Sequence, residues 1–139
     1  MSGETDLATL LRTMQPQLAE QPYVFCSTDH ITAAPLLDRA IGMFREAEGV
    51  TLMLEQQQSD QIGLRYGAAW ALITLTVHSS LSAVGFLAAL SQRLAEAGIS
   101  LNAVSAFYHD HLFVPWAERD RAMAILTMVD NADNQSYIQ

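Results

Sequence analysis

The chain has 139 residues, half of them hydrophobic, with seven basic and fifteen acidic residues and a net charge of −8. This composition predicts a folded body with a packed core, and it disfavours a nucleic-acid binder, which needs a basic face. All seven basic residues are arginine and there is one cysteine, which excludes a Schiff-base lysine, a P-loop lysine, an internal disulfide and a cysteine-rich zinc site.

The spacing of apolar residues predicts alternating helices and strands in the first half of the chain. The predicted elements are a helix over 6–14, a strand over 23–26, a loop with one helical turn over 27–38, a strand over 50–55 and a short polar helix over 56–62. Residues 37–44 have helical spacing, but 41–45 also fit a strand, and periodicity alone leaves both open.

The second half has a clearer pattern, in the order strand, helix, strand, strand, helix. The predicted elements are a strand over 71–77, a helix over 81–97, strands over 99–108 and 111–114, and a helix over 118–129. Ser79 or Ser80 is expected to cap the long helix, and Gly98 to end it. The first half contains a comparable sequence pattern, so we expect two α+β units packed together as one body.

The densest polar patch, Thr76 to Ser80, lies where the strand turns into the long helix. The first amides of a helix are unpaired and carry partial positive charge, so a carboxylate fits there, helped by the hydroxyls of Ser79 and Ser80. Gly85 would let a ligand or another backbone approach. The alternative is that the serines only cap the helix and Gly85 only eases helix packing.

Two other groups of residues have a chemical alternative and a structural one. His109 and His111, with His78, form a possible set of metal ligands, but a reversal at Asp110 would separate the two side chains and no further metal motif accompanies them. Cys26 follows an apolar run, which predicts a buried, unreactive thiol rather than a nucleophile.

The second half resembles the ACT domain, a small regulatory module with a ferredoxin-like β-α-β-β-α-β order. The segments that carry this resemblance are LTVHSSLSAVG, LAEAGIS and YHDHLFVP. This half of the chain is similar to the regulatory domains of aspartate kinases. With YVFCS and FREAEGVTLML, the chain resembles, over residues 5–129, a family of short bacterial proteins built from tandem ACT-like halves. The resemblance implies an α+β fold of two such units, with antiparallel sheets and helices on one face.

We therefore predict a partial ACT-like unit over residues 1–67 and a full one over 68–139. The resemblance implies binding of an amino acid or related carboxylate metabolite at the first strand-to-helix turn and the facing strand. The implied ligand-binding residues are His78, Ser79, Ser80, Leu81, Val84 and Gly85, with Asn102 and Ser105 opposite. This chain departs from the usual turn at residues 78–80, and its first half lacks a long first helix.

The prediction is a regulatory protein without catalytic residues, cofactor or bound metal, whose partners are a small-molecule ligand and a second copy of the chain. The alternatives are a metal-binding protein or metal-dependent enzyme using His78, His109 and His111, or an interaction module without a ligand. The acidic N-terminus and single cysteine favour the cytoplasm. The longest apolar stretch, residues 66–77, is too short to span a membrane.

Overall fold

The computed structural model describes residues 6–76 and 84–127. Contacts divide the chain into two compact units: the split unit, which joins Met1–Ala19 to Ala71–Gln139, and the inserted unit, Glu20–Trp70. The N-terminal segment therefore groups with the second half of the chain. The boundary predicted between residues 67 and 68 stays a prediction about sequence domains.

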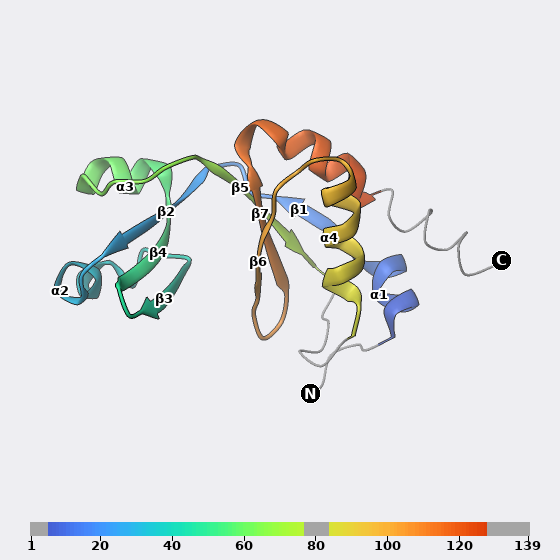
Figure 1. Cartoon of the computed structure of the whole chain (residues 1–139), viewed down its shortest axis with the longest axis horizontal. Coiled ribbons are helices and arrows are strands. Elements are labelled where there is room, and N and C mark those ends of the chain that lie inside the picture. Colours follow the sequence, from blue (N-terminus) through green and yellow to red (C-terminus); the bar gives the residue numbers. More distant parts are fainter. Residues whose placement is uncertain (1–5, 77–83, 128–139) are drawn as a thin grey trace. The chain divides into compact units, whose positions relative to one another are not determined.

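The inserted unit has the order strand, helix, strand, strand, helix (Figure 1). Its elements are β2 (Tyr23–Thr28), α2 (His30–Ala33), the 3-10 turn η1 (Ala34–Leu36), β3 (Gly42–Glu46), β4 (Gly49–Glu55) and α3 (Gln56–Ile62). The strands are antiparallel in the order β3-β4-β2, and Tyr23 also lies opposite Trp70, where β5 begins. Of the two alternatives for residues 41–45, the strand is correct.

Alternate residues of β2 and β4 build the core of the inserted unit, because successive side chains of a strand point to opposite faces. The buried members are Val24, Cys26, Val50, Leu52 and Leu54, joined by Ala33 and Leu36 of the short helices. The Cys26 thiol is buried, as predicted, and lies 3.2 Å from the Ser59 hydroxyl.

The split unit is assembled from both ends of the chain. Its elements are α1 (Leu7–Thr13), β1 (Pro16–Leu18), β5 (Trp70–Leu75), α4 (Phe86–Glu96), β6 (Asn102–Ser105), β7 (Asp110–Pro115), the 3-10 turn η2 (Trp116–Glu118) and a helix over residues 119–127. The strand order is β1-β5-β7-β6, with Gln17 opposite Thr74. No strand was predicted over residues 16–18, although this segment completes one side of the sheet.

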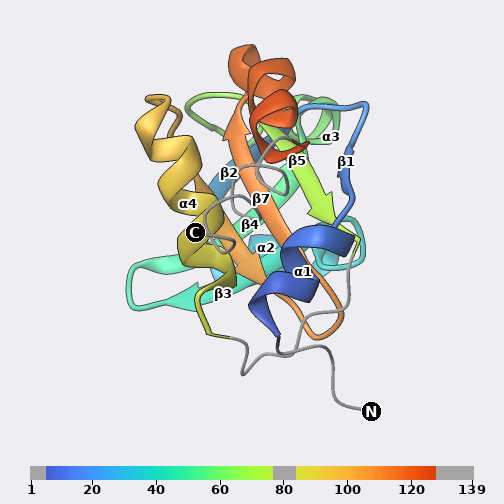
Figure 2. The ribbon, with the colours of Figure 1, turned by 90° about the vertical axis from the view of Figure 1, so that its right-hand side faces the viewer.

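Helices cover one face of this sheet, where α1 and α4 lie in front of β5 and β7 (Figure 2). The sheet contributes Ala71, Ile73, Leu75, Leu112 and Val114 to the core. The helices contribute Leu10, Leu11, Phe86, Leu90, Leu94, Ala122 and Leu126. The predicted α+β class, with antiparallel strands and helices on one face, is therefore confirmed.

Three predicted boundaries in this unit were wrong. The long helix begins at Phe86 rather than at residue 81, because Gly85 has a positive φ of 85° and serves as the N-cap. The strand predicted over 99–108 is only Asn102–Ser105. It ends there because the Ala106 amide donates a hydrogen bond to the His109 carbonyl and closes a turn. The last helix begins at residue 119 rather than at residue 118, because residues 116–118 form the 3-10 turn η2.

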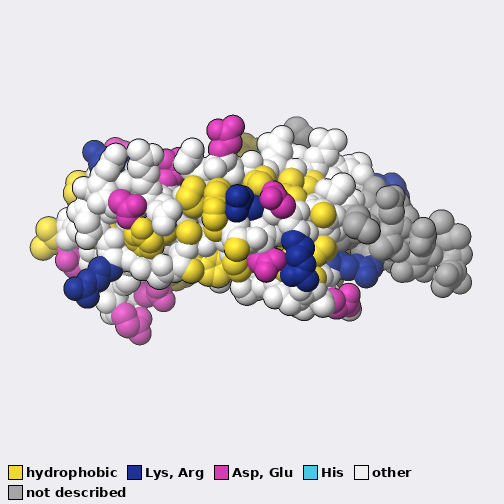
Figure 3. Space-filling view, turned by 90° about the horizontal axis from the view of Figure 1, so that it is seen from above, with side chains coloured by type: hydrophobic (Ala, Val, Ile, Leu, Met, Phe, Trp, Pro, Cys, Tyr) yellow, Lys and Arg dark blue, Asp and Glu magenta, His cyan; other side chains and the backbone are white. Residues whose placement is uncertain are grey.

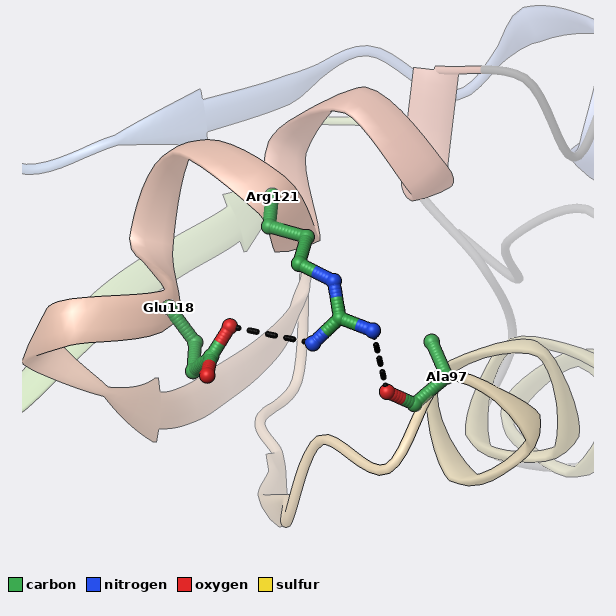
Figure 4. Close-up of polar contacts among 3 residues, drawn as sticks. All are labelled: Ala97, Glu118 and Arg121. Carbon is green, nitrogen blue, oxygen red and sulfur yellow. Dashed lines mark hydrogen bonds and ion pairs between the residues drawn. The ribbon is translucent and has the colours of Figure 1, made fainter.

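Arg121 ties the helix over residues 119–127 to the end of α4 (Figure 4). One guanidinium nitrogen donates to the Ala97 carbonyl at 2.5 Å, and the other lies 3.2 Å from the Glu118 carboxylate. The carbonyls at the end of a helix have no partner within the helix, so this donor satisfies one of them. The Arg121–Glu118 ion pair is exposed and contributes little to stability by itself.

Candidate functional site

The predicted strand-to-helix turn begins where β5 ends. The amide and hydroxyl of Thr76 both donate to the carbonyl of Gln15, at 3.1 and 2.7 Å, so the segment before β1 holds the end of β5. His78, Ser79, Ser80 and Leu81 lie outside the described residues. The structure is described again from Val84, immediately before α4.

The start of α4 differs from the starts of α1 and α2. In α1 the N-cap carboxylate of Asp6 accepts a hydrogen bond from the Thr9 amide, and in α2 that of Asp29 accepts one from the Thr32 amide. These hydrogen bonds, with those from the threonine hydroxyls, hold the pKa of each aspartate below its usual value. The N-cap of α4 is Gly85, which has no side chain to do this. The expectation that Ser79 or Ser80 is the N-cap of this helix was wrong.

Gly85 is required for its backbone conformation rather than for the space it leaves. Its φ of 85° is a left-handed conformation that residues with a side chain rarely adopt. A Cβ atom there would lie 3.6 Å from the Leu7 side chain, which is an ordinary contact. The neighbouring Val84 side chain is 84% exposed. The helix therefore starts from an open turn with an aliphatic side chain on its surface.

The two predicted residues on the facing strand do not point the same way. Asn102 lies opposite Phe113 and Ser105 opposite Asp110 in the register of β6 and β7. Since they are three positions apart, their side chains lie on opposite faces of the sheet. Ser105 shares the helix-covered face with Leu112, and its hydroxyl donates to the Asp110 carboxylate at 2.6 Å. Asp110 is buried and was not singled out as a binding residue by the sequence analysis.

The proposed metal ligands are not gathered in the part of the chain that the structure describes. No group of three His, Cys, Asp or Glu side chains lies together there, and His78 is outside it. The Nδ1 atom of His111 is 3.0 Å from the Thr74 hydroxyl, on the face of the sheet away from the helices. His109 lies in the turn between β6 and β7.

The burial of His111 predicts a measurable pH dependence. Burial, followed by the nearby His109, lowers the pKa of His111 below 6.5, whereas Asp110 acts in the opposite direction. The unfolded chain therefore binds the proton more readily, and stability falls as the pH drops below 6.5. We expect the loss of unfolding free energy between pH 7 and pH 5 to be smaller in His111→Gln than in the wild type. Urea unfolding at each pH measures this.

The matched control is His30→Gln, which removes an exposed histidine at the start of α2. An equal change of the pH dependence in His30→Gln and His111→Gln would show that the effect is not specific to His111. An equal loss of stability with falling pH in the wild type and His111→Gln would contradict the assignment to His111.

An aromatic hairpin tip adds a feature that the sequence analysis did not identify. Phe107 and Tyr108 are 61% and 62% exposed, and their ring centroids lie 4.9 Å apart in an edge-to-face arrangement. The tip and the start of α4 lie at the same end of the split unit (Figure 1). Exposed aromatic pairs of this kind are frequent in binding surfaces. The sequence feature that could have indicated this pair is a phenylalanine and a tyrosine directly before the predicted turn.

Charged and apolar side chains are mixed on the surface of the described residues. On the face drawn in Figure 3, arginine and acidic side chains are interspersed with apolar ones and form no continuous basic patch. In the described part of the chain, no helix has the length and apolar character needed to cross a bilayer.

The sequence matches two models of one family. Both are described as the ACT domain, one matching residues 2–71 and the other residues 69–128. A search of curated proteins found no match.

Several solved structures have a similar fold. A Vibrio cholerae protein of unknown function, described as a possible transport protein, is 42% identical, with a TM-score of 0.79, and the match covers 89% of this chain and 95% of that one. The regulatory subunit of aspartate kinase from Thermus thermophilus is 11% identical, with a TM-score of 0.59 and coverage of 86% and 98%. Aspartate kinase from Clostridium acetobutylicum is 10% identical, with a TM-score of 0.65 and coverage of 86% and 35%.

Proposed function

The chain belongs to the ACT-domain family, and from that premise we propose that it is a regulatory protein, without catalytic activity, that binds a small carboxylate-bearing metabolite. The proposed ligand is an amino acid or a close relative. The fold shared with regulatory subunits of aspartate kinase supports a regulatory role. The proposed binding residues are those predicted from the sequence, His78, Ser79, Ser80, Leu81, Val84, Gly85, Asn102 and Ser105.

The observation that carries this proposal is the N-cap of α4, Gly85, which has no side chain to accept hydrogen bonds from the helix amides. An eleven-residue helix that starts at a glycine has amides in its first turn that its N-cap residue does not satisfy. A ligand carboxylate can accept hydrogen bonds from such amides and is favoured there by the helix dipole. Of the two β6 residues, Ser105 is on the face that α4 covers, so we propose it as the nearer contact.

The structure of the inserted unit favours one binding site per chain, in the split unit, rather than one in each unit. Its corresponding helix, α2, has four residues, and the Asp29 carboxylate already accepts the Thr32 amide and hydroxyl. A protein carboxylate therefore occupies the place that a ligand carboxylate would take. We propose that the split unit alone binds the metabolite.

Isothermal titration of the full chain against a panel of amino acids and keto acids tests the proposal. We expect one compound to bind with one site per chain, and Val84→Asp to weaken that binding about ten-fold. The added carboxylate would stand beside the start of α4 and repel the ligand's own. The matched control is Ile31→Asp, which should leave affinity unchanged, because Ile31 is 88% exposed in the corresponding helix of the inserted unit, α2.

Two results would count against the site. Equal weakening by Val84→Asp and Ile31→Asp would point to a general charge effect. Absence of binding by every compound at millimolar concentration would favour the alternative of an interaction module without a ligand.

We further propose that the protein acts as a homodimer in the cytoplasm. The dimer is supported by two edge strands of the described structure, β3 and β6, whose residues are mostly exposed. The compartment is supported by the cysteine content of the chain, a single cysteine that is buried.

A further inference from the structure

The sheet of the inserted unit has one face that the helices of this unit do not cover. The core residues of β2 and β4, such as Val24 and Leu52, pack against α2 and η1, so the alternate residues of these strands point the other way, onto what we call the open face. The strand register places the following residues on the open face: Tyr23, Phe25, Ser27, Gly42, Phe44, Glu46, Gly49, Thr51, Met53, Glu55 and Trp70.

The aromatic rings of the open face lie around Met53. Met53 is opposite Phe25 on one side and Gly42 on the other. Its methyl carbon would lie 2.9 Å from a Cβ atom at Gly42, so the methionine side chain extends over the glycine. The Phe25 and Trp70 rings are in edge-to-face contact, with 6.0 Å between their centroids, and the Phe44 side chain is 68% exposed. The open face therefore presents aromatic and aliphatic surface outside the core.

The ionised side chains of the open face are both acidic. Glu46 lies near one end, where its carboxylate accepts a hydrogen bond from the Thr51 hydroxyl, and Glu55 lies at the other end, opposite Tyr23. Among the described residues of this face none is basic, since Arg45 of β3 has the opposite orientation. Carboxylates beside aromatic rings attract a cation, because the face of an aromatic ring is itself negative.

The spacing of the two carboxylates defines what can lie between them. Gly49, opposite Glu46, is six residues before Glu55 on β4, which is about 20 Å along an extended strand. An extended segment that lies along this strand would meet the two carboxylates with residues six positions apart. Its second and fourth residues after the first cation would then lie over the apolar centre, around Met53.

Other occupants fit this surface less well. A second copy of the chain would bring the same two carboxylates to a surface that is already acidic, and the whole chain carries −8. Single-stranded nucleic acid stacks bases on aromatic side chains, but Glu46 and Glu55 would repel its phosphates. The uncovered face of the split unit differs, since Gln17, Thr74 and His111 lie across it.

We propose that the open face of the inserted unit binds a basic segment of another protein, with two arginine or lysine residues six positions apart and apolar residues between them. The cations pair with Glu46 and Glu55, and the apolar residues cover Met53 and the rings around it. This interaction goes beyond the proposed metabolite binding and is independent of it.

Tryptophan fluorescence tests the proposal, because Trp116→Phe leaves Trp70, on the open face, as the only tryptophan. The probe is the heptapeptide RSLSLSR with blocked termini. The control peptides are ESLSLSE, which reverses the charge, and RRSLSLS, which has the same composition with adjacent cations. We expect RSLSLSR to move the Trp70 emission to shorter wavelength and to saturate. ESLSLSE should cause no shift, and RRSLSLS should bind about three-fold or more weakly.

Two variants in the same background locate the contact. Phe44→Ser removes the exposed ring and Glu46→Gln removes one carboxylate, and each should raise the dissociation constant of RSLSLSR about three-fold or more. The matched control is Glu96→Gln, which removes an exposed carboxylate that also accepts one side-chain hydrogen bond, but at the end of α4, and should leave affinity unchanged.

Three results would overturn the proposal. No response of Trp70 to RSLSLSR at millimolar concentration, or an equal response to ESLSLSE, would exclude recognition of a basic segment. Equal weakening by Glu46→Gln and Glu96→Gln would show attraction to the net charge of the chain instead of the open face. Equal affinity for RRSLSLS would overturn the spacing of the two cations.

Discussion

We expect Leu10→Ala to lower the free energy of unfolding of the split unit by about 2–5 kcal/mol, because it leaves a cavity in a packed core. Leu10 lies in α1, is fully buried, and shares a core cluster with Leu90 and Ile73. The change therefore removes packing between the N-terminal segment and elements more than sixty residues later in the chain. Few single substitutions in this protein should cost more.

Tryptophan fluorescence during urea unfolding reports each unit separately. Trp116 packs against the core of the split unit, and Trp70 lies 6.0 Å from the Phe25 ring in the inserted unit. In a Trp70→Phe background, Leu10→Ala should move the Trp116 transition to lower urea. The matched control is Ile31→Ala, which truncates a side chain that is 88% exposed and should change stability by less than about 0.5 kcal/mol.

An unchanged Trp116 transition in Leu10→Ala would contradict the assignment of α1 to the split unit. It would instead favour the division predicted from the sequence, in which residues 1–67 form one domain. The same experiment therefore tests the fold and the predicted domain boundary.

Local periodicity predicted most elements because their side chains alternate between core and solvent. The strands around Leu52 and Ile73 and the helix around Leu90 carry that pattern in their own residues. The strand β1 does not, since it has three residues and is defined by pairing with β5, more than fifty positions later. No window of sequence contains both partners, so periodicity could not reveal this strand.

The candidate site was predicted only in part. The sequence predicted a site at the strand-to-helix turn before α4, and this location stays a prediction. The start of α4 depends on the positive φ of Gly85, which no hydrophobic pattern encodes. The opposite orientations of Asn102 and Ser105 follow from strand geometry and could have been predicted. The burial of Asp110 depends on packing beneath the helices, and a hairpin sequence gives no sign of it.

Gly49→Ala should destabilise the inserted unit by about 2–4 kcal/mol, for two reasons that act together. The φ of Gly49 is 153°, which residues with a side chain rarely adopt, and a Cβ atom there would lie 2.8 Å from the backbone carbonyl oxygen of Thr28. A carbonyl held in β2 cannot move away without breaking pairs with β4. Since Gly49 lies opposite Glu46, the distortion would also reach β3.

Two other glycines separate backbone strain from collision. Gly63 has a φ of 85° with no heavy atom within 4 Å of an added Cβ, so Gly63→Ala should cost only about 1–2 kcal/mol. Gly67 has no positive φ and equally open surroundings, so Gly67→Ala should be neutral or stabilising by up to about 1 kcal/mol. Urea unfolding followed by Trp70 fluorescence in a Trp116→Phe background should rank the three variants in this order. A Gly49→Ala protein no less stable than Gly63→Ala would mean that the turn between β3 and β4 yields to the added atom.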